Sequence, residues 1–210
     1  MSSPIKVTTR ADWAAQNPRL LLGELGQEKD TGNLKIGNGK QSWNDLPYHG
    51  CPGYWGSFWD STSQTAAAVD TPQTILLRAG DSNSRGVFIA SSGRITVAHP
   101  GVYSLTFSIQ FSNSDSSIHD VNVWLRKNDS GTSGDVPDTD SRFSVISRHG
   151  SIDGNVIGTV NYVLPLAGSD YLELMWATTN LAAYIHAEPS GATHPAIPGI
   201  ICTVVQVASA

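Results

Sequence analysis

Charged residues are scarce in this chain of 210 residues, and those present form no basic stripe. Lysine and arginine number 13 against 18 aspartates and glutamates, which gives a net charge of −5. Proteins that bind nucleic acid present a concentrated positive surface to the phosphates. We therefore expect no nucleic-acid partner.

Long apolar runs are also missing. No stretch approaches the ~20 apolar residues that a membrane-spanning helix requires. The start of the chain, MSSPIKVTTR, lacks the apolar core of a signal peptide. These observations predict a chain that folds in a cytosol and does not insert into a membrane.

Cysteine is nearly absent, and complete catalytic motifs are lacking. Cys51 and Cys202 lie far apart without the spacing of a metal or redox site, so we expect both to stay reduced, with a disulfide as the open alternative. His186-Ala187-Glu188 matches half of a zinc deaminase signature, but the required Pro-Cys-x-x-Cys does not occur. No Gly-x-Ser-x-Gly nucleophile elbow exists. The sequence predicts no enzyme, no cofactor and no metal site.

One long segment alternates between apolar and polar residues, from Val102 to Phe111. Such a period of two predicts a half-buried antiparallel strand, which needs partner strands and a second layer. From residue 56 onward, about ten short strands separated by Gly, Asn, Asp and Pro turns are predicted. The expected fold class is therefore all-β, with a sandwich or jelly-roll head. The apolar face of the long strand comprises Tyr103, Leu105, Phe107, Ile109 and Phe111.

The first 55 residues differ in composition from the rest. Asp30-Thr31-Gly32 predicts a turn, and Asn38-Gly39 is a strong two-residue hairpin signal. We predict a small β-ribbon, too poor in apolar residues to hold a core and therefore dependent on support from identical chains. The Pro- and Gly-rich segment 47–56 is a candidate neck. The expected domains are 1–55 and 56–210.

Residues 11–48, ADWAAQNPRLLLGELGQEKDTGNLKIGNGKQSWNDLPY, resemble an N-terminal module of many bacteriophage tail-fibre and tropism proteins. The shared motifs, in order, are a Trp, an Asn-Pro, a Gly-Glu, an acidic-Thr-Gly, a Lys-Ile-Gly-x-Gly and a Trp-x-x-Leu-Pro-Tyr. The resemblance implies a place in a virion, where such modules attach or intertwine a trimeric fibre.

A second resemblance covers residues 56–210. The segments ITVAHPGVYSLTFSIQF, VNVWLRKND, SDYLELMWATTN and IPGIICTVVQV are similar, in this order, to the globular-head family of complement and tumour-necrosis-factor-like proteins. The shared features include a Pro-Gly-x-Tyr that enters the longest strand and the Lys127-Asn128 turn. The last strand departs from the family, because Ile200 to Val205 is aliphatic rather than aromatic. The resemblance implies a ten-stranded jelly roll, three per assembly, with both termini at one end.

Some strands are apolar on both faces. Leu172, Leu174 and Trp176 face one way while Tyr171 and Met175 face the other, and residues 200–207 are apolar nearly throughout. A monomeric sandwich needs only one apolar face per strand. We therefore predict a homotrimer whose axis covers the second face.

These observations predict a trimeric bacteriophage virion fibre. Its N-terminal module contacts other virion proteins, and its jelly-roll head binds a glycan or protein of the host surface. The expected location is the virion, after folding in the host cytoplasm. One alternative is a capsid fibre or decoration protein with the same domains. Another is a depolymerase of envelope polysaccharide, which would need two carboxylates flanking the scissile bond, usually on a longer β-helix.

Strand parity predicts which loops contact the host. If residue 56 marks the base and each successive strand reverses, loops 112–120, 148–155 and 179–197 lie at the far end. The acidic loop 128–142 then lies at the base. Long loops on a rigid scaffold commonly carry binding sites; the alternative for Tyr184 to His186 is a short edge strand. The candidate receptor-binding residues are Tyr184, His186, Glu188, His194, His119, Asn113, Asp115, His149 and Asp153.

Overall fold

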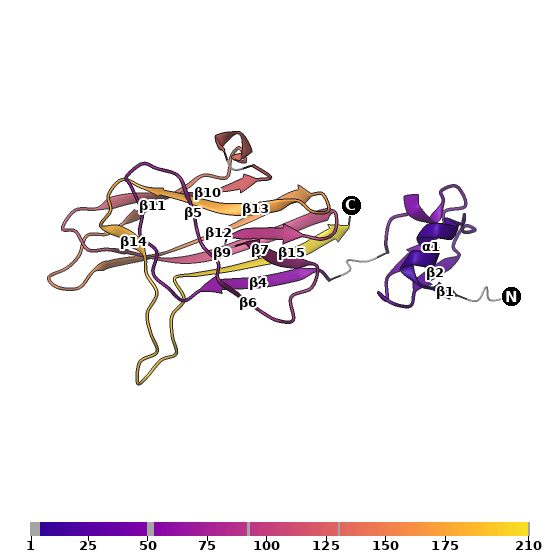
Figure 1. Ribbon diagram of the computed structural model, residues 1–210, viewed down its shortest axis with the longest axis horizontal. Helices are drawn as coiled ribbons and strands as arrows, with labels where there is room; N and C mark the ends of the chain where they lie inside the picture. Colours follow the sequence, from indigo (N-terminus) through magenta and orange to yellow (C-terminus); the bar gives the residue numbers. More distant parts are fainter. Residues whose placement is uncertain (1–4, 50–52, 92, 130, 210) are drawn as a thin grey trace. The chain divides into compact units, whose positions relative to one another are not determined.

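The computed structural model describes residues 5–49, 53–91, 93–129 and 131–209. The chain divides into two compact units, one of Met1–Gly53 with Gln206–Ala210 and one of Tyr54–Val205, so the larger unit begins two residues before the expected start of the head (Figure 1). Cys51 lies outside the described residues. Among the described residues, no helix combines the length and apolar character needed to cross a membrane.

The smaller unit combines a short sheet with two helical segments. Strand β1 runs parallel to β2, and β2 runs antiparallel to β3. The turn between β2 and β3 is the predicted Asp30-Thr31-Gly32, where Gly32 has a φ of +76° and donates its N–H to the Glu28 carbonyl. The described elements are β1 (Lys6–Thr8), α1 (Arg10–Gln16), β2 (Leu25–Glu28), β3 (Leu34–Ile36) and the 3-10 turn η1 (Trp43–Asp45).

The smaller unit has a core of its own. Trp13, Leu20, Trp43 and Leu46 are buried together, and the two indole rings stack with centroids 4.0 Å apart and planes 10° from parallel. The prediction of a ribbon too poor in apolar residues to hold a core is therefore wrong. Two indoles bury as much apolar area as several aliphatic side chains, and a count of apolar residues underestimates them.

The prediction of a two-residue hairpin at Asn38-Gly39 is also wrong. Asn38 Oδ1 accepts the backbone N–H groups of Lys40 and Gln41, at 2.9 and 2.8 Å, so the residues do form a turn. The chain then enters η1 rather than a returning strand. Gly39 has a positive φ of 71°, but Asn38 is not among the described residues with a positive φ, so the two-residue hairpin turn that needs both does not form.

The larger unit is a two-layer β-structure. One layer, the β9 sheet, has the strand order β12-β9-β15-β4-β6, with β14 also paired to β9. The other layer, the β10 sheet, has the order β11-β10-β13-β8-β7, with β5 also paired to β13. The described elements are β4 (Trp55–Asp60), β5 (Gln73–Thr74), β6 (Ala79–Gly80), β7 (Val87–Ser91), β8 (Arg94–Val97), β9 (Gly101–Asn113), β10 (His119–Lys127), η2 (Thr132–Gly134), β11 (Ser141–Val145), β12 (Gly154–Leu166), β13 (Tyr171–Thr178), β14 (Ala183–Ile185) and β15 (Ile200–Ser209).

Successive strands pass repeatedly from one layer to the other, which is the connectivity of a jelly roll. The chain crosses between layers after β4, β5, β6, β8, β9, β11, β12 and β13. The predicted fold class, an all-β jelly-roll head with a small N-terminal module, is therefore confirmed, although the module also contains α1.

The core lies between the two layers and contains the predicted face of β9. The five apolar side chains from Tyr103 to Phe111 are fully buried, while the polar residues between them are only partly buried. Cys202 of β15 belongs to the same core as a free thiol, and burial raises its pKa to about 12. A thiol with such a pKa is protonated and unreactive at neutral pH.

The second apolar face of β13 is covered within the chain. Met175 is only 2% exposed and lies opposite Thr74 of β5, whose Oγ1 is 3.6 Å from its sulfur. The guanidinium of Arg94 lies over the Tyr171 ring, 4.6 Å from its centroid. The prediction that another subunit covers this face is therefore wrong. The short strand β5 covers it from within the chain, and the sequence analysis did not place a strand there.

Candidate functional site

The strand registers gather three loops at one end of the larger unit. Asn113 lies opposite Gly154 in the β9 sheet, and His119 lies opposite Val145 in the β10 sheet. Thr178 lies opposite Val121, so β13 ends at the same place. We call this end the apical end. Loops 112–120, 148–155 and 179–197 all start or finish there, as the parity argument predicted.

The chain enters the larger unit at the opposite, basal end. Trp55 pairs with Val205, whereas Asp60 at the other end of β4 pairs with Ile200. Figure 1 shows β11 and β14 at the end of the sandwich away from the arrowhead of β15. The acidic loop begins at the basal end, where the Asn128 N–H donates to the Tyr171 carbonyl at 3.2 Å.

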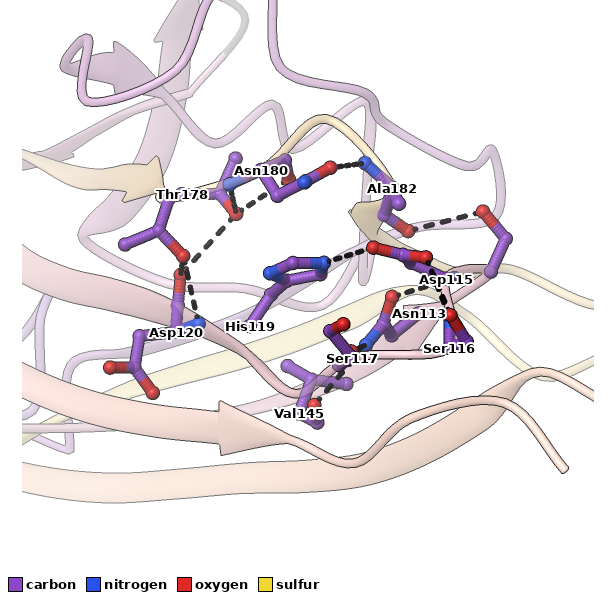
Figure 2. A network of polar contacts seen from close by, with 12 residues as sticks. Asn113, Asp115, Ser116, Ser117, His119, Asp120, Val145, Thr178, Asn180 and Ala182 are labelled. Carbon is purple, nitrogen blue, oxygen red and sulfur yellow. Dashed lines mark hydrogen bonds and ion pairs between the residues drawn. The ribbon is translucent and has the colours of Figure 1, made fainter.

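Asn113 holds the apical loops together from inside. Its side chain is fully buried, and Nδ2 donates to the carbonyls of Ser117, Val145 and Ile146 at 2.7, 3.3 and 3.2 Å. Its Oδ1 accepts the N–H of Asp115 at 2.9 Å (Figure 2). With both amide atoms occupied, Asn113 positions the loops and does not present a surface to a ligand, which corrects its proposed contact role.

Asp115 and His119 are hydrogen-bonded to each other beside Asn113. His119 Nε2 lies 2.7 Å from Asp115 Oδ2, and the imidazole is the more buried partner, at 13% exposure against 39%. The hydrogen bond with His119 and the backbone N–H of Ser116 hold the pKa of Asp115 below its ordinary value. Figure 2 shows the pair between the end of β9 and the segment Asn180–Ala182.

The second apical loop packs against the first. The Arg148 N–H donates to the Asp115 carbonyl at 2.8 Å, and the Ser114 N–H donates to the Ala182 carbonyl at 3.1 Å. His149 is exposed and starts a tight turn that closes on Ile152. The backbone thus brings the three apical loops into contact, which places His149 on the same end as Asp115.

Tyr184 lies on a short strand, which was the alternative considered for residues 184–186. Strand β14 pairs with the end of β9, and Ala183 and Ile185 are buried on either side of Tyr184. The Tyr184 hydroxyl donates to Asp153 Oδ2 at 2.8 Å, and the His186 ring meets the tyrosine edge-on at 5.7 Å. Desolvation, and then the bond to Asp153, raise the pKa of Tyr184.

The segment after β14 forms an exposed excursion. Glu188 and Ile197 exchange two backbone hydrogen bonds of 2.9 Å, which close the excursion at its base. His194 Nε2 lies 4.0 Å from Glu188 Oε1, with both side chains more than one-third exposed. The excursion extends away from the sandwich as the yellow loop between β14 and β15 in Figure 1. Glu188, His194 and His149 are therefore the exposed members of the predicted set.

At the acidic loop, the structure places Asp135, which the sequence analysis did not select as a site residue, in contact with Trp124 and Arg126. Trp124 Nε1 and Arg126 Nε both donate to Asp135 Oδ1 at 2.8 Å. Burial would raise the pKa of Asp135, but these two hydrogen bonds outweigh it and lower the pKa. A pocket of about 680 Å³ lies beside this group, lined by Trp124 and aspartates 135, 138 and 140. In the described part of the chain, no cluster of three or more His, Cys, Asp or Glu side chains is arranged to hold a metal ion.

The apical site is suited to binding. It presents hydroxyl, imidazole, carboxylate and aromatic groups on loops that a rigid sandwich holds in place, the combination that recognises polar ligands at a surface. Its carboxylates at Asp115 and Asp153 are already engaged by His119 and Tyr184.

No protein-family model and no curated protein sequence matches the chain. Among solved structures, the chain is similar to Eiger TNF from S. frugiperda, with a TM-score of 0.51 and 17% identity over 75% of this chain and 94% of that chain. The globular domain of zebrafish complement 1qA protein aligns with a TM-score of 0.46 and 15% identity over 74% of this chain and 97% of that chain. The similarity to Eiger TNF shows that the chain contains a jelly roll of the tumour-necrosis-factor-like type.

Proposed function

We propose that the chain is the subunit of a trimeric bacteriophage virion fibre and that its larger unit binds the host surface through the apical loops. The observation that carries this proposal is the gathering of three polar loops at the end opposite Tyr54. A chain that enters a rigid sandwich at one end leaves the other end free for contact. The resemblance of residues 11–48 to a tail-fibre module supports the virion role.

Exposed aliphatic residues on the outward face of the β9 sheet support self-association. Ile157 and Val163 of β12 are both 61% exposed, and Ile201, Val205 and Val207 of β15 are 43, 38 and 51% exposed. These side chains share the face that points away from the core, and such patches commonly mark interfaces. Light scattering of the full-length protein should give about three times 22.4 kDa. A monomer at micromolar concentration would contradict the trimer.

The smaller unit is proposed to attach the protein to the particle. It has its own core, so it can act as a separate module at the end of the fibre. A fragment of residues 54–210 should remain soluble, melt cooperatively and fail to enter virions. An unfolded fragment would show that the two units depend on each other. Electron microscopy of virions carrying labelled protein would distinguish a tail from a capsid position.

Host binding is tested at the exposed part of the apical end. Combined Glu188→Ala and His194→Ala substitutions, at two exposed side chains, should abolish adsorption of the head to host cells while the mass and melting temperature stay unchanged. Asp138→Ala, in the acidic loop, is the matched control and should adsorb normally. The opposite pattern would assign binding to the acidic loop. Release of new reducing ends from envelope polysaccharide would instead indicate a depolymerase.

A further inference from the structure

Large aliphatic side chains are exposed at the apical end of the larger unit. Ile118, in the loop after β9, is 62% exposed, and Ile146, directly after β11, is 54% exposed. Leu181, in the loop after β13, is 49% exposed. A single exposed aliphatic residue is ordinary, but several at one end of a protein commonly mark an interaction surface. We call these three residues the apical aliphatic patch.

Strand register brings Ile118 and Ile146 together. His119 lies opposite Val145 in the ladder between β10 and β11. Ile118 and Ile146 are the next residues outward from that pair, so the same register places them across from each other. Asn113 Nδ2 donates to the Ile146 carbonyl at 3.2 Å and to the carbonyl just before Ile118 at 2.7 Å. One buried amide therefore holds both segments in place.

Leu181 joins the patch through two backbone hydrogen bonds on either side of it. The Thr179 N–H donates to the Asp120 carbonyl at 3.0 Å, and the Ala182 carbonyl accepts the Ser114 N–H at 3.1 Å. The turn that carries Leu181 is thus bonded to both ends of the loop between β9 and β10. Figure 2 shows these two segments next to each other.

The proposed trimer contact leaves the patch open. Val121 and Val145 point into the core, so Ile118 and Ile146, which have the opposite parity, lie on the outward side of the β10 sheet. The aliphatic residues that support self-association lie on the outward face of the β9 sheet. The core separates the two sheets, so their outward faces point in opposite directions. A trimer built through the β9 sheet does not cover the patch.

Arg148 supplies a positive charge beside the patch. Its backbone N–H donates to the Asp115 carbonyl at 2.8 Å, which holds it against the first apical loop. Its side chain is exposed and forms no ion pair with the residues that the structure describes. The nearby carboxylates of Asp115 and Asp153 are hydrogen-bonded to His119 and Tyr184. Arg148 can therefore pair with a carboxylate from outside the chain.

These groups fit one class of partner better than the others. Aliphatic side chains offer no hydrogen bond to sugar hydroxyls. Anionic lipid surfaces are recognised by clusters of about four to eight lysines and arginines, whereas this patch has one arginine in a chain of net charge −5. The centres of protein–protein interfaces combine apolar side chains with arginine and contain few other charges.

We propose that the apical aliphatic patch binds a protein of the host surface. Apolar residues of that protein cover Ile118, Ile146 and Leu181, and one of its carboxylates pairs with Arg148. The inference rests on the proposed function, because it names the class of receptor that the same end of the head contacts.

The first test measures adsorption of labelled full-length protein to host cells. Digestion of the cells with proteinase K should abolish adsorption, and oxidation of their glycans with periodate should leave it intact. Vesicles of phosphatidylethanolamine and phosphatidylglycerol should bind none of the protein. Adsorption that survives the protease, or binding to the vesicles, overturns this inference and leaves host binding as proposed. Failure to adsorb to untreated cells overturns the proposed function and this inference together.

The second test locates the contact. Combined Ile118→Ser and Leu181→Ser substitutions should weaken adsorption at least about tenfold, because less apolar surface is buried in the complex. Arg148→Glu, which leaves the aliphatic residues in place, should weaken it about tenfold by repelling the partner's carboxylate. Leu21→Ser and Arg10→Gln, at exposed positions of the smaller unit, are the matched controls and should adsorb normally. Unchanged adsorption of either test variant, with an unchanged melting temperature, would overturn the assignment of the patch.

Discussion

Each of the two units contains a stacked pair of aromatic rings, but the two pairs make up very different shares of the core of their unit. In the smaller unit, Trp13 and Trp43 stack at 4.0 Å and make up half of the described core cluster. In the larger unit, Tyr54 and His99 stack at 3.9 Å and 9°, at one end of a core that spans two sheets. The same contact is therefore central in one unit and peripheral in the other.

The difference follows from size. A small module buries a low fraction of its surface on folding and has little stability to lose. A jelly roll distributes its apolar contacts over many strands, so no single contact decides whether it folds. The comparison predicts that substitutions of similar chemistry will unfold one unit and only weaken the other.

The largest effect is expected from Trp43→Ala. Replacing a buried aromatic side chain by alanine costs ~3–5 kcal/mol, which is comparable to the whole stability of a small module. The smaller unit should lose its structure while the larger unit keeps its melting temperature, as followed by NMR of each unit during denaturation. Leu21→Ala, at a side chain 72% exposed, is the control and should change neither unit. Simultaneous loss of both units would show that they unfold as one.

A smaller effect is expected from His99→Ala. Removing the ring that stacks on Tyr54 should cost the larger unit ~0.5–1.5 kcal/mol beyond the lost area and leave it folded. Denaturant unfolding of the 54–210 fragment measures this change. His99→Phe retains a ring and should recover most of the loss. A substitution that unfolds the fragment would place the Tyr54 stack at the centre of the core.

The smallest effect concerns pH. Hydrogen bonds lower the pKa of Asp12, whose carboxylate accepts the hydroxyls of Thr9, the N-cap of α1, and of Thr8, and the pKa of Asp115, which is hydrogen-bonded to His119. A carboxyl whose pKa is lower in the folded protein contributes stability above its unfolded pKa, and this is lost as the pH falls through the folded pKa. Carboxyl NMR titrations should show both midpoints below the ordinary aspartate value. An ordinary midpoint for either would mean that its hydrogen bonds do not persist in solution.

The sequence predicted much of the larger unit, because the alternation of apolar and polar residues was enough to assign the core face of the strands and their directions. The buried residues of β9 and the ends of β10, β12 and β13 follow from a period of two and from the reversal of successive strands. In the smaller unit the same approach failed, because Trp13 and Trp43 are 30 positions apart and belong to no repeating pattern. Stacking between distant residues leaves no local signal.

For the apical site, the sequence identified which loops lie together but not which side chains are available. The sequence alone does not distinguish Asn113, His119 and Glu188, which are all polar loop residues. In the structure Asn113 is buried, His119 is hydrogen-bonded to Asp115, and Glu188 is exposed. Availability depends on contacts with loops that come from other parts of the chain. The same is true of Gln73 Nε2, which has no acceptor among the described residues, a fact that its neighbours in sequence do not reveal.

The sequence by itself determined the all-β class, the core face of the long strands and the apical position of the three loops. These properties depend on side chains that alternate along one strand and on the connections between strands, both of which are local. Only the tertiary structure decided that Met175 is covered by β5, that two indoles hold the smaller unit together and that no described residue accepts a hydrogen bond from Gln73 Nε2. Each of these depends on a three-dimensional contact between distant segments, where packing and hydrogen bonding decide the outcome.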